Sequence, residues 1–505
     1  MVGGHLRGQA LSRGNQTDAR QAIEREEGGR MTKLVAVVRA HRPFALLLVA
    51  GAVLRGLAMV AYQPALLLSR DAYVYLRDAH ALSFGGLRPA LYPVFLKPAV
   101  AVHDLTLAVT AQHLMGLGMA VGIYVLCRRL GLGPVLGALS TAPVLLDGYQ
   151  IQIEQFIMSE TLFEALAVAA CVLLLWPWRK AVLALPAAAA AGFLIALAFF
   201  TRYVGAALLV AAALFFLFSE GPARRRVVSC ATLAACFLLP LAAYSLLLET
   251  PSGADKIGYP LYGRVAAFVD CKELDLPRAD RPLCPKFSPR DGDHHLTIWF
   301  SESPLAEIGG TADPRVDGLL RDYALRAIAR QPVAYLASVG RDLVRYFEPL
   351  PPPVLDSKVS LWLAPRTLDD ARPLHRQVER LEASPPPALG FHDRLRIARP
   401  AADGLRYYQL IVYTWGPLVA AAALLGLIGA GLGRRSAGGK RALASAGLLC
   451  ALVVLGLLLA RVTLGVYGYR YLIVTIPLVG PAAAMGITII DSRWSFLRSF
   501  RRRRE

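Results

Sequence analysis

After its first long apolar run, the chain reads Leu67-Leu-Ser-Arg-Asp-Ala-Tyr-Val-Tyr-Leu-Arg-Asp-Ala-His80. The apolar residues of this stretch recur at the spacing of one helix face, which predicts an amphipathic helix lying on a membrane surface. At about 100° per residue, Asp71 and Asp78 share one edge of that helix, and Arg70 and Arg77 share another. We expect both acids to face the water just above the lipid, where they either keep the helix at the surface or carry chemistry.

The composition is that of a membrane protein. Of the 505 residues, 55% are hydrophobic and 18% are charged, and the mean hydropathy is +0.46. These values exclude an ordinary soluble globular protein. The formal net charge is +19, but its arginines stand in short tracts beside apolar runs, where they set orientation and contact anionic lipid. We therefore expect membrane lipids as partners and no nucleic acid.

Apolar runs of membrane-spanning length predict an all-α polytopic fold with about ten transmembrane helices. The runs lie near residues 44–63, 106–127, 132–148, 157–176, 182–200, 203–219, 227–248, 407–431, 442–461 and 471–490. Basic tracts fall on one side of the membrane when the spans are counted in order, and this bias predicts a multi-pass plasma-membrane protein with both termini in the cytoplasm.

This topology divides the chain into five parts. They are a basic, disordered cytoplasmic tail (1–43), a module of seven spans (44–248) with a first external loop (64–105), a mainly helical extracytoplasmic domain (249–405), a module of three spans (406–490) and a second basic cytoplasmic tail (491–505).

Two of the seven cysteines, Cys271 and Cys284, fall in the extracytoplasmic domain, thirteen positions apart. An oxidising compartment favours a disulfide between them. The other five lie in or beside apolar runs, where a cysteine is usually a small core residue.

Ionisable residues in or beside membrane spans are costly and commonly functional. Most of those in this chain lie near the external ends of the spans, so a closed bundle would gather them around one external cavity. They are Asp71, Asp78, His113, Glu154, Glu160, Arg202 and Arg470.

Each of these residues also has a purely structural interpretation. His113 is equally suited to a hydrogen-bonded core position, and Arg55 can pair within the bundle. Glu160 can stabilise the start of a helix, and Arg202 and Arg470 can reach up to lipid headgroups.

Five short motifs carry a family resemblance by their order along the chain. They are Ser-Arg-Asp71-Ala-Tyr-Val-Tyr, Arg88-Pro-Ala-Leu-Tyr-Pro93, Met-Ser-Glu160-Thr-Leu-Phe, Phe-Thr-Arg202 and Gly-Tyr-Arg470-Tyr. From about residue 44 to 490 the chain resembles the GT-C membrane glycosyltransferases, and in particular the bacterial branch related to protein O-mannosyltransferases and the aminoarabinose transferase of lipid A.

The resemblance implies transfer of a sugar from a polyprenyl phosphate to a hydroxyl acceptor outside the membrane, with Asp71 as the catalytic base. The protein mannosyltransferases have an Asp-Glu pair at this position, whereas Ala72 follows Asp71 here. The acceptor is therefore left open among a lipid, a glycan and a protein.

The prediction from sequence is an inverting, lipid-phosphate-sugar-dependent glycosyltransferase that needs no cofactor or essential metal. Asp71 is the expected base, and the expected substrate-binding residues are Arg70, Arg88, Tyr92, His113, Glu160, Arg202 and Arg470. One alternative is a transporter or flippase of a polyprenyl-linked substrate, although transporters typically place such groups near the membrane midplane in two matching halves. A second alternative is an assembly partner without activity.

Overall fold

The computed structural model describes residues 39–67, 69–82, 88–176, 184–219, 222–247, 257–278, 280–285, 314–349, 396–434, 436 and 439–502. The predicted N-terminal tail lies almost wholly outside these residues. Parts of the predicted extracytoplasmic domain (249–405) lie outside them as well, namely 249–256, 279, 286–313 and 350–395.

The first half of the described chain is helical apart from one short strand. In order, it contains a first helix Arg39–Ala61, then β1 (Tyr62–Gln63), α2 (Ser69–Ala81), α3 (Leu91–Ala101), α4 (Leu105–Arg129), α5 (Pro134–Leu139), α6 (Ala142–Leu146), α7 (Gly148–Gln155), α8 (Glu160–Leu175), α9 (Ala184–Thr201), η2 (Tyr203–Gly205), α10 (Ala206–Phe218) and α11 (Ala223–Leu247).

The second half begins with the predicted extracytoplasmic domain and includes the long helices α18, α19 and α21. It contains α12 (Gly258–Val265), η3 (Arg281–Leu283), α14 (Pro314–Arg330), α15 (Pro332–Arg345), β2 (Arg396–Ile397), α17 (Arg399–Ile411), α18 (Gly416–Gly433), α19 (Gly439–Leu464), α20 (Arg470–Ile473) and α21 (Ile476–Arg502).

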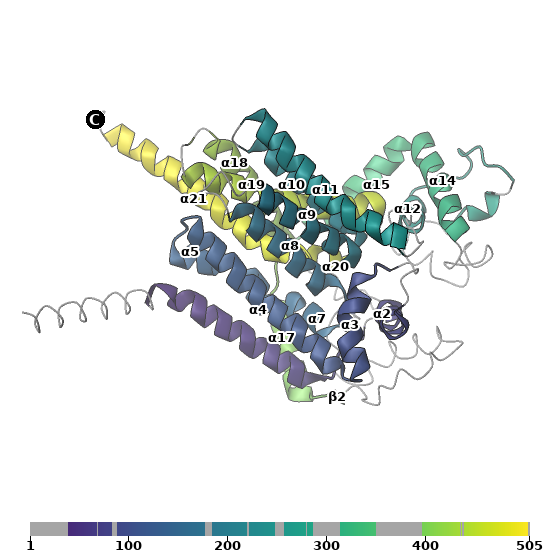
Figure 1. The fold of residues 1–505 in the computed structure, drawn as a ribbon, viewed down its shortest axis with the longest axis horizontal. Helices are drawn as coiled ribbons and strands as arrows, with labels where there is room; N and C mark the ends of the chain where they lie inside the picture. Colours follow the sequence, from purple (N-terminus) through teal and green to yellow (C-terminus); the bar gives the residue numbers. More distant parts are fainter. Residues whose placement is uncertain are drawn as a thin grey trace, which may run out of the picture.

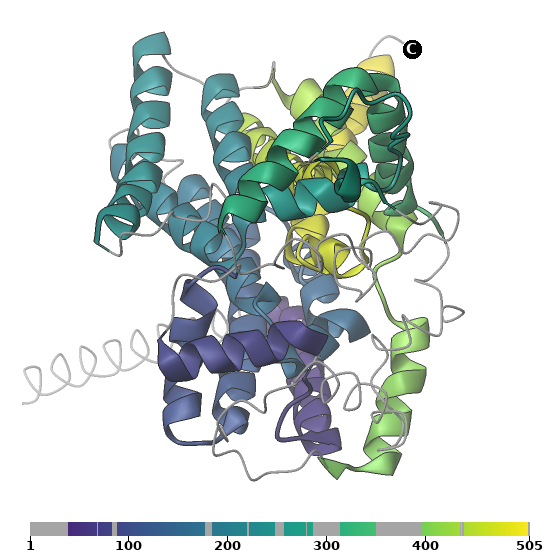
Figure 2. The same ribbon diagram turned by 90° about the vertical axis from the view of Figure 1, so that its right-hand side faces the viewer.

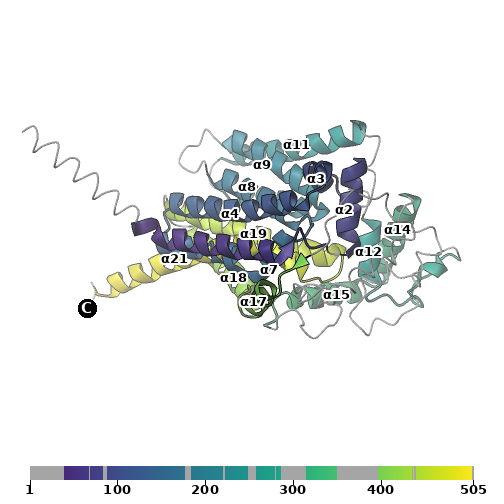
Figure 3. The ribbon, with the colours of Figure 1, turned by 90° about the horizontal axis from the view of Figure 1, so that it is seen from below.

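The long helices form one bundle whose axis runs roughly across the page in Figure 1. Helix α9 packs against α8 and α11, and α18, α19 and α21 pack against one another. Helix α2 lies across one end of the bundle, seen end-on in Figure 1 and lengthwise in Figures 2 and 3. Helices α12 and α14 lie near that same end, whereas the start of the first helix and the end of α21 lie at the other.

Among the described residues, five helices are long and apolar enough to cross a membrane. They are Arg39–Ala61, Leu105–Arg129, Ala223–Leu246, Gly416–Gly433 and Gly439–Leu464. The other predicted spans fall on shorter or interrupted helices, and some of the interruptions coincide with proline. The run 132–148 divides into α5 and α6, with Pro143 in the first turn of α6, because proline lacks the N–H that a helix interior needs.

The predicted span 407–431 combines the end of one helix with most of the next. Residues 407–411 belong to α17, the chain leaves the helix at Val412, and α18 begins at Gly416 with Pro417 in its first turn. The run 471–490 is likewise divided between α20 and α21.

The expectation that both acids of α2 face water is wrong. Asp71 is 7% exposed and Asp78 is 2% exposed. The apolar face of α2 packs on α3, with Ala72 and Leu76 in one buried cluster with Leu96. Other side chains of the protein also cover the edge of α2 that carries Asp71 and Asp78. The helix is therefore buried along this edge as well as along its apolar face.

Two short backbone pairings connect distant parts of the bundle at this end. Strand β1 pairs antiparallel with β2, which ties the end of the first helix to the start of α17. Leu66 and Phe156 form a parallel bridge, in which the Leu66 N–H donates to the Gln155 carbonyl over 3.0 Å and the Ile157 N–H donates to the Leu66 carbonyl over 3.0 Å. These residues directly precede α2 and α8, so the bridge brings the beginnings of those two helices together.

The predicted extracytoplasmic domain has its own small core and a disulfide. Tyr262 of α12 packs with Leu320 and Tyr323 of α14, and Cys271 is bonded to Cys284 with 6.1 Å between their Cα atoms.

We expect the double substitution Cys271→Ala/Cys284→Ala to lower the stability of this domain by about 3 kcal/mol, because the bond closes a loop of 13 residues and limits the unfolded chain. Denaturant-dependent proteolysis of the domain measures the loss. Cys230→Ala, at a half-buried free cysteine, is the matched control. If both cysteines are detected as free thiols in protein that has not been reduced, the prediction is contradicted.

The two ends of the helix bundle are predicted to face opposite sides of the membrane, and this topology can be tested. We expect a membrane-impermeant thiol reagent to label Asp322→Cys in α14 of intact cells, because the side chain of Asp322 is 63% exposed in the domain predicted to be outside. Arg225→Cys, in the basic first turn of α11, should react only after the cells are opened. Labelling of Arg225→Cys in sealed cells would reverse the orientation.

Candidate functional site

A chain of ion pairs joins five of the residues predicted from sequence. One oxygen of Asp71 pairs with Arg88, and the other accepts a hydrogen bond from Arg470 Nη1 over 2.9 Å. Arg470 Nε lies 3.2 Å from Glu160 Oε1, and Arg202 Nη1 lies 2.8 Å from the same oxygen. The order is therefore Arg88, Asp71, Arg470, Glu160, Arg202, and we call this set the ion-pair chain.

Each member stands at or near the end of a structural element. Asp71 lies in the first turn of α2, and Glu160 and Arg470 are the first residues of α8 and α20. Arg202 occupies the turn between α9 and η2. Arg88 lies just before α3. The carboxylates thus sit where helix N-termini favour negative charge, and the five side chains converge because the elements meet at one end of the bundle.

A hydroxyl and two aromatic rings extend the ion-pair chain inwards. Arg202 Nη1 donates to Ser159 Oγ over 3.1 Å, and the Tyr75 hydroxyl lies 3.1 Å from the same oxygen. The Tyr75 ring packs edge-on against Tyr92, with 4.8 Å between centroids. The Tyr92 hydroxyl in turn donates to Gln112 Oε1 over 2.8 Å. Tyr92, which was predicted as a substrate contact, is fully buried. It packs against Tyr75 next to the ion-pair chain.

Arg461, at the end of α19, belongs to the same region and was missed in the sequence interpretation. Its guanidinium lies 3.8 Å from the centroid of the Tyr471 ring, which Arg202 and Arg470 also approach at 5.0 and 5.2 Å. An arginine at the end of an apolar run is equally typical of a headgroup contact. The sequence contains no signal that separates the two roles.

Positive charge exceeds negative charge among these side chains. The guanidinium groups belong to Arg88, Arg202, Arg461 and Arg470, and the carboxylates belong to Asp71 and Glu160, which leaves an excess of two formal positive charges. The side chains of Arg88 and Arg470 are 26% and 16% exposed, whereas that of Glu160 is 0% exposed. The region is therefore a partly open cation cluster suited to an anion.

The electrostatics of Asp71 follow from two opposing effects. Burial favours the neutral acid, but Arg88 and then Arg470 favour the carboxylate, and together they lower the pKa of Asp71 below its ordinary value. Asp78 behaves in the opposite way. Burial raises the pKa of Asp78, and the pairing with Arg77 at 2.8 Å and the charge of Arg88 offset this only in part.

The structure places His113 in a different buried cluster. Its Nδ1 lies 2.9 Å from Glu154 Oε2, and its Nε2 lies 2.8 Å from Gln155 Oε1. Arg55 Nε donates to the same Glu154 oxygen over 2.7 Å. His113 therefore occupies a hydrogen-bonded core position, which is the structural interpretation that the sequence also allowed. Arg55 pairs within the bundle, as its structural interpretation predicted.

Arg70 lies in α2, but its side chain is outside the described part of the chain. The ion-pair chain therefore contains five of the eight predicted site residues. Tyr92 lies next to it, His113 lies away from it, and Arg70 is left as a prediction. Among the described residues, there is no group of three or more His, Cys, Asp or Glu side chains arranged to hold a metal ion.

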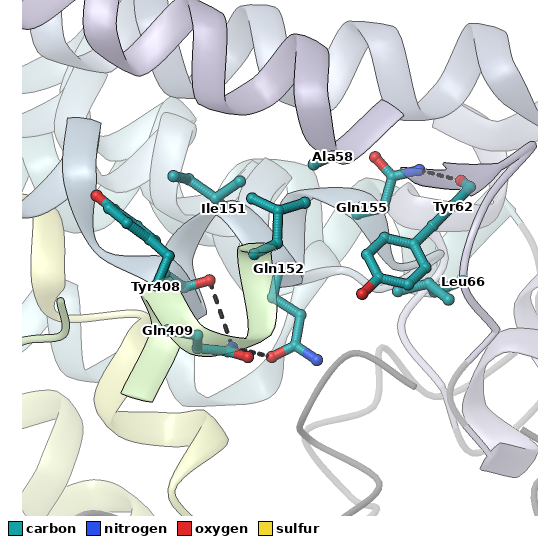
Figure 4. Close-up of a pocket in the computed structure, with 10 residues that line it drawn as sticks. Ala58, Tyr62, Leu66, Ile151, Gln152, Gln155, Tyr408 and Gln409 are labelled. Carbon is teal, nitrogen blue, oxygen red and sulfur yellow. Dashed lines mark hydrogen bonds between the residues drawn. The ribbon is translucent and has the colours of Figure 1, made fainter. Parts of the chain in front are cut away.

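A separate small pocket lies between the first helix, α7 and α17 (Figure 4). In it, Gln409 donates to Gln152 Oε1 and Gln155 Nε2 donates to the Tyr62 carbonyl over 2.7 Å. It is lined by Ala58, Tyr62, Leu66, Gly148, Ile151, Gln152, Gln155, Leu405, Tyr408 and Gln409. Because no predicted site residue lines it, this pocket is distinct from the ion-pair chain.

Comparison with known proteins finds similar structures but no sequence relatives. No protein-family model and no curated protein sequence matches the chain. The archaeal oligosaccharyltransferase AglB from Archaeoglobus fulgidus, solved in complex with an inhibitory peptide and a dolichol-phosphate, is similar over 92% of this chain at 12% identity and a TM-score of 0.44. Its apo form is similar at 12% identity and a TM-score of 0.43. In both comparisons the chain spans 52% of the length of the archaeal protein.

Proposed function

We propose that this protein is a GT-C-type membrane glycosyltransferase that moves a sugar from a polyprenyl phosphate to a hydroxyl acceptor at the external membrane face. The observation that carries the proposal is a buried carboxylate, Asp71, held inside a cluster with an excess of two positive charges. Such transfer needs a base for the acceptor proton and cations for the departing phosphate.

The proposed reaction is a single displacement. The acceptor oxygen attacks C1 of the sugar from the face opposite the phosphate, the bond from C1 to the phosphate oxygen breaks, and Asp71 takes the hydroxyl proton. The phosphate leaves with one more negative charge than it had in the donor. Arg88, Arg202, Arg461 and Arg470 are the groups available to stabilise that charge. Attack from the opposite face inverts the configuration at C1.

Asp71 is a weak base while two arginines hold its oxygens. A donor phosphate competes for the same guanidinium groups, since Arg88 and Arg470 are partly exposed and each guanidinium carries five N–H donors. Donor binding would thereby draw positive charge away from Asp71 and raise its basicity. The proposal accordingly predicts an ordered reaction in which the donor binds before the proton is taken.

The pKa of Asp71 gives this mechanism a pH signature. Because that pKa is lowered, kcat/KM should hold as the pH falls through the ordinary aspartate range and decline only when it passes through the folded-state pKa. We expect Arg88→Gln, which removes the first of the two cations, to raise the pKa of Asp71 and move the acidic limb to higher pH. An acidic limb at the same pH in both proteins would contradict this assignment.

The function itself is tested with a polyprenyl phosphate carrying a radiolabelled sugar, and lipid, glycan and peptide hydroxyls offered in turn as acceptors. The proposal predicts release of free polyprenyl phosphate in equal amount to the glycosylated product, with inverted configuration at C1 by NMR. A transporter or flippase would move the labelled donor across a vesicle membrane with its sugar still attached. That outcome would overturn the proposed reaction.

A further inference from the structure

Helix α15 of the extracytoplasmic domain is hydrogen-bonded to the loop between α19 and α20. The Tyr467 N–H donates to Asp342 Oδ2 over 3.0 Å, and the Tyr346 hydroxyl donates to the Gly468 carbonyl over 3.2 Å. The Tyr335 hydroxyl donates to the Thr463 carbonyl over 3.1 Å. Tyr335 and Asp342 of α15, with Tyr346 directly after it, thus engage the backbone from Thr463 in the last turn of α19 to Gly468 in the loop.

A buried arginine ties a second helix of the domain to the same loop. Arg264 of α12 is 0% exposed and pairs with Asp342, while also donating to Ser338 of α15. Its Nη1 donates to the Gly465 carbonyl over 3.2 Å. Asp342 therefore receives both the Arg264 charge and the Tyr467 amide, and links the domain to the membrane bundle.

Aromatic contacts hold the same part of the loop from the side. The rings of Tyr346 and Tyr467 lie 4.7 Å apart between centroids, and the guanidinium of Arg345 lies 4.4 Å from the centroid of the Tyr467 ring. Tyr346 is 1% exposed. The loop is thus held through hydrogen bonds to its backbone and through the packing of its Tyr467 ring on the buried ring of Tyr346.

The loop leads directly into the ion-pair chain. Two positions after Gly468 the chain reaches Arg470, whose side chain contacts both carboxylates, Asp71 at 2.9 Å and Glu160 at 3.2 Å. A shift of about 1 Å at a reacting group can cost about 10²-fold in rate, so the position of this loop controls the geometry of the cluster.

We propose that the extracytoplasmic domain is a clamp that positions Arg470, with Asp342, Arg264 and Tyr346 as positioning residues that touch neither donor nor acceptor. The inference rests on the proposed function for its catalytic consequence, but the clamp itself is a property of the fold. It assigns a role in the reaction to a domain that lies outside the membrane bundle.

The direct test of the clamp is hydrogen exchange of the full-length protein in detergent. Asp342→Asn should speed exchange of the amides of residues 466–470, because it weakens the acceptor of the Tyr467 N–H and leaves the Arg264 charge without its partner. Tyr346→Phe, which removes only the hydroxyl, should speed exchange of the Gly468 amide, whose N–H donates to that hydroxyl over 3.4 Å, and keep the buried ring. Asp322→Asn, at an exposed ion pair of the same domain, is the control and should change neither. Unchanged exchange in both test variants would overturn the clamp, whatever reaction the protein performs.

The consequence for Arg470 is tested with a double-mutant cycle, using polyprenyl monophosphate binding as the readout so that no sugar transfer is needed. Asp342→Asn should weaken binding about tenfold in the native background. It should have no further effect in an Arg470→Ala background, because the residue through which it acts is gone. An equal, additive loss in both backgrounds would show that Asp342 acts on general stability and would overturn the proposal. If the cycle behaves as expected and no sugar is ever transferred, the clamp stands and the proposed function fails.

Discussion

Asp71→Asn is expected to lower turnover by roughly 10²–10⁴-fold while donor binding persists. The amide keeps the size of the carboxylate and can still accept a hydrogen bond from one arginine, but it cannot take the acceptor proton. Because Asp71 lies between Arg88 and Arg470, the substitution also removes the negative charge that holds these guanidinium groups in place. Single-turnover transfer with a saturating labelled donor separates the chemical step from binding.

Asp78→Asn is the matched control, since Asp78 is as deeply buried as Asp71 and lies in the same helix. It stands about 10 Å further along that helix and pairs with Arg77. Its replacement should cost much less activity in protein of equal thermal stability. Near-normal transfer by Asp71→Asn, together with loss of transfer in Glu160→Gln, would mean that the base is misassigned.

Arg470→Ala is expected to lower turnover by about 10²–10³-fold, the usual cost of losing one charge-stabilising donor in an active site. It should also lower the free energy of unfolding, because each of two buried carboxylates loses one of its two cations. The two effects are separated by measuring transfer at a temperature where the variant remains folded.

Two further variants define the role of Arg470. Arg470→Lys keeps the positive charge but cannot contact both carboxylates with one planar group, so it should recover stability more fully than activity. Arg77→Ala, at an arginine of α2 whose side chain is 58% exposed, should leave transfer nearly unchanged. Full activity in Arg470→Ala would remove this residue from the proposed site.

Much of the site could be predicted because charge in an apolar setting is conspicuous. Asp71, Arg88, Glu160, Arg202 and Arg470 come from well-separated parts of the chain, and each stands beside a run that is apolar enough to enter a membrane. A charged group at such a position must find a partner or water. The predicted alternation of spans places them at one end of the bundle, and the structure joins them in one chain of ion pairs.

What could not be predicted depends on partners that are distant in sequence. The amphipathic pattern of α2 indicated one buried face, but the partners that cover Asp71 are arginines from other parts of the chain. Arg461 resembled an ordinary headgroup contact, and His113 became a core residue because Glu154 and Gln155 lie on either side of its ring. Nothing local to Arg264 or Asp342 indicated that these residues meet each other and the loop before α20.

The helix count shows a similar limit. Hydropathy shows which segments are apolar. A break of a few residues leaves the mean hydropathy over a membrane-spanning window almost unchanged. The break between α17 and α18 at Val412–Trp415 is an example. Proline positions and local hydrogen bonding decide where each helix begins.

The central claim is that the arginine cluster around Asp71 binds the phosphate of a lipid-linked sugar. The most direct measurement is an electron cryomicroscopy structure of the Asp71→Asn protein with a polyprenyl-phosphate sugar bound. The account predicts phosphate density in contact with Arg88 and Arg470, with C1 of the sugar facing residue 71. Phosphate density at another site, with the ion-pair chain unchanged, would contradict it.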